Sequence, residues 1–237
     1  MAKNKAIKKL GKSEYLIIDL TQPLREDAEV HPLDPKPEKI VIADFLKNRV
    51  KYNVYKIGDH HFQPHFDAPN HQNPELRGKG AEVYGLEQAF NSACMIDVSK
   101  KGKGNYLVEV KREHLEPFGE LISKRGAVIV RTGYDKWIES NKKHTPGGLP
   151  YFSRDAAEFL AGFKNLVVVG IDSLTVDAFK MHDSHRALKE KFIIESLVHL
   201  YEIPENAREN FTLQTSPVRI VGASGGPIVA YAFIELK

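Results

Sequence analysis

The chain has 237 residues and a formal net charge of +3, with 42% hydrophobic and 27% charged residues. These values are typical of a globular protein that buries a hydrophobic core, and they exclude a protein that is disordered over long segments. No apolar run approaches the ~20 residues that span a bilayer, and residues 1–12 lack the apolar stretch of a signal peptide. We therefore expect a cytoplasmic protein without a membrane partner.

Five lysines lie within the first twelve residues, so the rest of the chain is close to neutral. A basic tail can bind nucleic acid, but a solvated terminus is the simpler interpretation. We expect a basic N-terminal tail at residues 1–13, one domain at residues 14–237, and no nucleic-acid partner. The single cysteine, Cys94, lies in an apolar run and is expected to pack as a small hydrophobic side chain in a strand.

Apolar runs and breaker residues predict the elements in chain order. The first half is expected to contain a strand at 15–20, an irregular proline-containing loop at 27–38, a strand at 50–57, a polar loop at 72–80, a short helix at 86–90 and a strand at 94–98. The second half is expected to contain a helical turn at 112–118, a strand at 127–130, helices at 135–141 and 154–163, a strand at 166–172 and a last strand at 227–236. The segment 184–200 is compatible with both helix and strand.

The helix at 154–163 lies between two buried apolar runs, and Ser153 is a good N-cap for it. A strand, a helix and a strand in this order indicate a crossover unit with parallel strand pairing. We find no internal repeat or linker in the sequence, so a single α/β domain is the expected architecture.

Residues 60–71 gather four of the ten histidines. His61, His65, Asp67 and His71 share the same parity, so an extended chain directs all four side chains to one face. A helix is disfavoured because Pro64 would lie within its turn. A straight strand would separate His61 from His65 by roughly 13 Å, so the chain is expected to bend between them.

Imidazole and carboxylate ligands together suit Zn²⁺, Mn²⁺ or Fe²⁺ in a site that leaves one position open for water. Such an ion lowers the pKa of bound water toward ~7 and polarises a carbonyl group. A set of surface histidines in a loop is the alternative. For four groups of one parity we favour the metal site, whereas the alternative is preferred for His60, which breaks the parity.

The stretch from His61 to His71 resembles the signature H-x-G-T-H-x-D-x-P-x-H of the metal-dependent cyclase family, which includes bacterial kynurenine formamidase and isatin hydrolase. Every histidine, the aspartate and the second proline match, while Gln63-Pro64 stands where the signature has Gly-Thr. Other similar stretches are IDLT at 18–21, RTGY at 131–134, GIDSLTVD at 170–177 and the later ligand segment at 185–195.

The resemblance implies a fold as well as a chemistry. The expected fold is one α/β domain at 14–237 with a mixed, barrel-like β-sheet core and flanking helices, of the swivelling β/β/α type. The family's proteins associate, so a homodimer or homotetramer is also implied.

The resemblance also assigns roles to residues. His61, His65 and Asp67 would bind one divalent ion, and Asp67, His185 and Glu195 would bind a second. One or two zinc or manganese ions per subunit are thus implied as cofactors, and His71 matches the catalytic histidine that shuttles the proton. His182 could replace His185 as a ligand, and His199 could support Glu195 if both lie on one helix, although a surface or core position is preferred for His199.

The leading functional hypothesis is an arylformamidase-like, metal-dependent hydrolase of C–N bonds in a small amide, formamide or lactam. Metal-bound water would be the nucleophile and His71 the proton shuttle. One alternative is a cyclase or dehydratase of small carbonyl compounds. Another is a protein that binds a metal or ligand without turnover, with the Gln63-Pro64 change as its cause.

Overall fold

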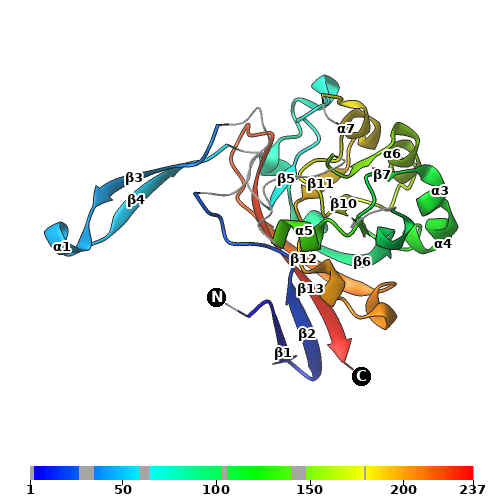
Figure 1. The fold of residues 1–237 in the computed structure, drawn as a ribbon, viewed down its shortest axis with the longest axis horizontal. Helices are drawn as coiled ribbons and strands as arrows, with labels where there is room; N and C mark the ends of the chain where they lie inside the picture. Colours follow the sequence, from blue (N-terminus) through cyan, green and yellow to red (C-terminus); the bar gives the residue numbers. More distant parts are fainter. Residues whose placement is uncertain are drawn as a thin grey trace.

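The computed structural model describes residues 3–26, 35–58, 64–102, 106–139, 148–178 and 180–236. Figure 1 shows a barrel-like body with helices on one side and a long arm that projects from it. The predictions for His60, His61, Gln63 and most of the proline-containing loop lie outside the described residues. None of the helices in the described ranges has the length and hydropathy that crossing a bilayer requires.

Within the described residues, seven strands close into a barrel-like sheet, because β13 pairs with β12 on one side and with β5 on the other. In chain order the seven are β5 (His65–Asp67), β6 (Phe90–Asp97), β8 (Ala127–Arg131), β10 (Val168–Ile171), β11 (Phe192–Glu195), β12 (Phe211–Pro217) and β13 (Gly225–Leu236). Strands β6, β8, β10 and β11 run parallel, while β5, β12 and β13 join them through antiparallel pairs. The predicted mixed, barrel-like α/β fold is confirmed.

The central strands are buried on both faces, which explains why they read as continuous apolar runs. In β8, Ala127 and Ile129 belong to the cluster inside the barrel, whereas Val128 and Val130 belong to the cluster beneath the helices. Cys94 on β6 is fully buried in the second cluster, and burial raises the pKa of its thiol to about 12. Its predicted packing role is confirmed.

Short helices cover the outer face of the parallel strands (Figure 1). The α-helices of the body are α2 (Leu86–Ala89), α3 (Arg112–Leu115), α4 (Gly119–Ile122), α5 (Asp135–Glu139), α6 (Arg154–Ala161) and α7 (Asp183–Leu188). The 3-10 turns are η1 (Pro74–Leu76), η2 (Ala81–Val83), η3 (Ser99–Lys101), η4 (Glu116–Phe118), η5 (Leu200–Glu202) and η6 (Glu205–Ala207), and β7 (Glu109–Val110) pairs with β9 (Tyr151–Phe152). Helix α6 connects parallel β8 and β10, as the crossover prediction requires.

Two segments differ from the sequence predictions. The basic segment expected to be a solvated tail contains β1 (Lys5–Leu10), which pairs with β2 (Ser13–Asp19) although all six of its side chains are exposed. The pairing uses backbone groups alone, and Gly11 takes the positive φ of 62° that the tight turn needs. The division into a tail at 1–13 and a domain at 14–237 stays a prediction.

The arm is the second difference. The predicted strand at 50–57 appears as β4 (Tyr52–Lys56), but its partner β3 (Glu38–Ala43) and the helix α1 (Phe45–Asn48) between them were not predicted. The segment predicted with ambiguity at 184–200 divides into α7, β11 and the turn η5. The chain changes from helix α7 to strand β11 between His185 and Glu195. Neither the helical nor the strand periodicity of apolar residues therefore extends through the segment.

Candidate functional site

Strand β5 holds the first two site residues. His65 and Asp67 lie two residues apart and therefore on one face of the strand. Strand β5 is held between β11 and β13, with Asp67 opposite Ile193 on one side and Gly225 on the other. The chain then turns, because the amide of His71 donates to the carbonyl of Ala68 at 2.9 Å. The predicted extended or turned backbone, in place of a helix, is confirmed over residues 65–71. The bend predicted between His61 and His65 involves residues outside the described ranges.

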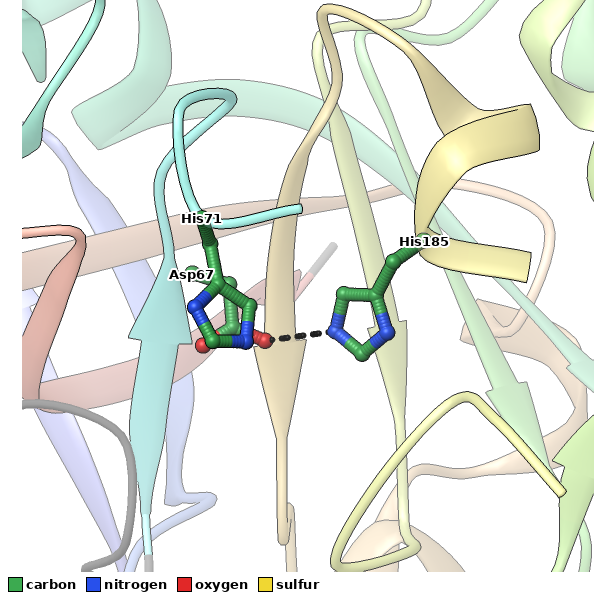
Figure 2. A group of neighbouring side chains, drawn as sticks. All are labelled: Asp67, His71 and His185. Atoms are coloured by element: carbon green, nitrogen blue, oxygen red, sulfur yellow. Dashed lines mark hydrogen bonds and ion pairs between the residues drawn. The ribbon is translucent and has the colours of Figure 1, made fainter. Parts of the chain in front are cut away.

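Side chains from three elements converge on this strand. Nε2 of His65 lies 3.0 Å from Oε2 of Glu195, which ends β11. Nε2 of His185, from α7, lies 3.1 Å from Oδ2 of Asp67. Figure 2 shows the imidazoles of His71 and His185 converging on the Asp67 carboxylate. The two rings stand edge to face with centroids 5.3 Å apart.

The site concentrates ionisable groups in the protein interior. His65, Asp67, His185 and Glu195 are each at most 8% exposed. Burial alone lowers the pKa of His185, but hydrogen bonds to Asp177 and Asp67, with the charge of Glu195, raise it to about 10. Burial and the charge of Asp67 raise the pKa of Glu195, against the opposing effect of His65. The pKa values of His185 and Glu195 therefore depend on the charged side chains around them as well as on burial.

The segment at 170–177 orients both distant residues of the site. Asp177 places Oδ2 2.6 Å from Nδ1 of His185 and accepts the backbone N–H of Ser184 at 2.7 Å. The backbone N–H of Val176 donates to Oε1 of Glu195 at 2.7 Å. Because Asp177 engages Nδ1 of His185, the other ring nitrogen, Nε2, is directed at Asp67.

The polar atoms form two groups with the spacing of metal ligands, and the groups share Asp67. One consists of Asp67, His71 and His185, and the other of His65, Asp67 and Glu195. Within each group the ligand atoms lie within 4.8 Å of one another. The arrangement brings together every predicted site residue that the structure describes.

The sequence also matches a known family. Residues 18–178 match the model of the family described as "Putative cyclase", which covers more than half of the chain. This chain belongs to that cyclase family.

Relatives of this cyclase-family chain share its fold over nearly its whole length. Cyclase-like protein 1 of Oryza sativa subsp. japonica is 25% identical over 217 residues, which are 90% of this chain and 76% of that protein. An isatin hydrolase bound to the product analogue thioisatinate superposes with a TM-score of 0.77 at 20% identity, over 93% of this chain and 92% of that one. A potential metal-dependent hydrolase with cyclase activity gives 0.69 at 20% identity, over 92% and 98%. At this identity the structural likeness shows the fold.

Two other histidines of this cyclase-family chain lie apart from the groups. His182 precedes α7 with a 56% exposed side chain, and its Nδ1 is 3.9 Å from Asp177. His199 does not share a helix with Glu195, because β11 ends there and Ser196 takes a φ of 61°. Its Nδ1 lies 2.7 Å from the carbonyl oxygen of Asp19 instead.

Sequence reasoning gave no role to two residues that contact the site histidines. Asp177 contacts His185, and its position eight residues before that histidine gave no signal by itself. The amide nitrogen of Gln72 lies 3.1 Å from Nε2 of His71. One hydrogen bond therefore joins the side chains of Gln72 and His71.

Proposed function

We propose that this protein is a metal-dependent hydrolase of C–N bonds in a small amide, formamide or lactam, with aryl formamides as the first substrates to test. The observation that carries the proposal is the convergence of His65, Asp67, His185 and Glu195 in the interior. Membership of the cyclase family supports it. The names of two structural neighbours, an isatin hydrolase and a potential metal-dependent hydrolase, point to the same chemistry.

The residues present fit a divalent ion. Asp67, Asp177 and Glu195 are three carboxylates at most 4% exposed around His185, so carboxylates outnumber the one imidazole whose pKa they raise, and a bound cation would compensate the buried negative charge. Two imidazoles and carboxylate oxygens are a donor set that both Zn²⁺ and Mn²⁺ accept. His65, Asp67, Glu195 and His185 would hold one or two ions, and the role of His61 as a further ligand stays a prediction.

A divalent ion bound here would polarise the substrate carbonyl and lower the pKa of a water molecule. The protein's own residues supply the rest. Asp177 fixes the ring of His185, and the backbone of Val176 fixes Glu195, so the ligand atoms are preorganised. His71 is half-buried at the edge of the group and can carry a proton from the attacking water to the leaving nitrogen. Gln72 orients the His71 ring for this transfer.

Metal analysis is the first test. The purified protein, stripped with a chelator and reconstituted with Zn²⁺ or Mn²⁺, is expected to retain one to two equivalents after gel filtration. Glu195→Gln removes a buried anionic ligand and should lower the retained metal by at least about tenfold, since such sites depend on charged donors. Glu235→Gln, an exposed carboxylate on β13, is the matched control and should bind as the wild type does.

Turnover separates the hydrolase from its alternative. The reconstituted protein is expected to hydrolyse N-formylkynurenine, isatin or a related small amide faster than simple esters. A protein that binds no metal on reconstitution would overturn the whole proposal. A protein that retains metal but turns over none of these compounds would instead support a binding role without catalysis.

Asp177→Asn tests how His185 is oriented. The amide oxygen of asparagine accepts the imidazole N–H more weakly than a carboxylate does. In the other orientation of its amide, asparagine presents a donor to that nitrogen. Loss of an outer carboxylate partner typically weakens metal binding 10–100-fold. We expect the Kd for Zn²⁺, measured by chelator competition, to rise by about that factor.

Asp155→Asn is the control for this substitution, since Asp155 is exposed at the start of α6. It should leave the Kd within about twofold, because surface substitutions far from a site have small effects. An unchanged Kd in Asp177→Asn would show that the 2.6 Å contact does not orient His185.

A further inference from the structure

The two groups of possible metal ligands lie on the outer face of the barrel. On β5 the side chain of Phe66 belongs to the cluster inside the barrel, so its neighbours His65 and Asp67 point outward. Residues directly opposite each other in antiparallel strands share a face. The pairs Pro227 with His65 and Gly225 with Asp67 therefore continue the outer face of the site onto β13.

Strand β13 keeps this alternation beyond the site. The side chains of Ile228 and Ala230 pack inside the barrel, so Pro227, Val229 and Tyr231 face outward. We call these three outward residues the outer row. At ~3.4 Å per residue, Val229 lies about 7 Å along the strand from Pro227, and Tyr231 about 14 Å. The outer row thus leads away from the ligands along one strand.

Exposure to solvent increases along the outer row. His65 is 4% exposed, Pro227 is half-buried and Val229 is 38% exposed. The β11 side of the site is covered instead, because Ile193 packs in the cluster beneath the helices. Helix α7, from which His185 enters the site, lies on that side (Figure 2). A small molecule that approaches the ligands from solvent would therefore pass over β13.

The outer row suits a flat apolar group. Gly225 has no side chain and the ring of Pro227 is compact, so neither residue extends a long side chain over the ligands. Val229 adds a branched apolar side chain. Ser216 lies opposite Val229 on β12 and accepts the side-chain amide of Gln214 at 2.7 Å. The apolar surface of the row therefore has a polar border on its β12 side.

A carboxylate marks the far end of the outer row. Asp19 on β2 lies directly opposite Tyr231. Its Oδ1 accepts the backbone amide of Thr21 at 3.1 Å and the Thr21 hydroxyl at 2.5 Å, which fixes the carboxylate in place. Because like charges repel across a contact, this end of the row disfavours an anionic substituent. A neutral ring suits the row better than a charged chain.

We propose that the ring of a small aromatic amide or lactam lies on Pro227 and Val229, and that Val229 limits the size of the ring. The inference rests on the proposed hydrolase function for the reacting group and adds the part of the substrate that is recognised. With its carbonyl group at the side chains of His65 and Asp67, the substrate would extend its ring about 7 Å to Val229. One methylene more or less in such an apolar contact changes selectivity by about 10–200-fold.

Binding of 2-aminobenzoate to the Zn²⁺-reconstituted protein tests the outer row without turnover. The fluorescence of this ligand gives its Kd, and displacement by acetate gives the Kd of a carboxylate without a ring. Val229→Tyr fills the space over the row, so the ratio of the 2-aminobenzoate Kd to the acetate Kd should rise by about tenfold or more. Val229 is 38% exposed, so the fold should tolerate tyrosine, which circular dichroism verifies.

Turnover on the same variants gives a second measurement. Val229→Tyr should lower the ratio of kcat/KM for formanilide to kcat/KM for N-methylformamide, which has no ring, by about tenfold, mainly through KM. Val229→Ala should shift preference from formanilide toward the larger N-formyl-2-naphthylamine. Ile7→Tyr is the matched control, because Ile7 is an exposed β-branched residue on β1, which joins the sheet beside the far end of β13. It should leave every ratio unchanged.

The outcomes separate this inference from the proposed function. Equal weakening of 2-aminobenzoate and acetate by Val229→Tyr would show a general disturbance of the site and overturn the inference. A wild type that does not bind 2-aminobenzoate, or a Kd that Val229→Tyr leaves unchanged, would place the ring elsewhere. Binding that depends on Val229, in a wild type that hydrolyses none of the amides, would support the outer row as an aryl site and remove the hydrolase function alone.

Discussion

His71→Ala is expected to lower kcat by about 10²–10⁴-fold while leaving the metal content unchanged, since a positioned general acid or base contributes a factor of this size. This expectation rests on the proposed hydrolase function. The structure places His71 close enough to Asp67 and His185 to exchange protons at the site. The measurement is kcat on the amide that the reconstituted wild type hydrolyses, with metal determined on the same preparation.

The same variant distinguishes two roles, because the spacing of His71 also suits a ligand. If metal and activity disappear together, His71 is a ligand rather than a proton carrier. If kcat is unaffected, it is neither. His114→Ala is a suitable control, because His114 lies in α3, where its Nδ1 accepts the Lys111 amide of its own helix start.

Asp172→Ala is expected to lower the free energy of unfolding by roughly 3–5 kcal/mol. Asp172 is fully buried and accepts four hydrogen bonds, from the amides of Thr132, Gly133 and Asp135 and from the Thr132 hydroxyl, at 2.7–3.1 Å. Alanine leaves these donors without their acceptor, and each unsatisfied buried donor costs about 1–3 kcal/mol, reduced where water enters. For a chain of this length the thermal midpoint should fall by roughly 10 °C.

Thermal unfolding followed by circular dichroism measures this effect. Glu235→Ala removes an exposed carboxylate and should change stability by no more than about 0.5 kcal/mol. A shift in Asp172→Ala no larger than in that control would show that water replaces the lost acceptor. The contacts of Asp172 also explain two of the sequence stretches that resemble the family, since the aspartate of GIDSLTVD holds the backbone of RTGY.

Local pattern was sufficient for a large part of the fold. The buried runs at 127–130 and 166–172 and the helix between them predicted the parallel pair β8 and β10, because a continuous apolar run indicates a strand covered on both faces. Hydrophobic patterns did not predict strands whose pairing depends on backbone hydrogen bonds or on an adjacent strand rather than on a buried apolar face. The lysine-rich β1 has no apolar side to recognise, and β3 follows prolines that indicated a loop.

The sequence by itself determined the ligand types and the shared face of His65 and Asp67, because residues two apart in an extended chain must point the same way. Only the tertiary structure decided that His185, 118 residues from Asp67, reaches it at 3.1 Å. The antiparallel register that sets Glu195 opposite His65 also comes from the closed sheet. The role of Asp177 became visible in the same way, since a hydrogen bond between distant segments has no local pattern. The sequence determines which side chains can bind a metal ion, whereas their closeness in space depends on the pairing of strands that are far apart along the chain.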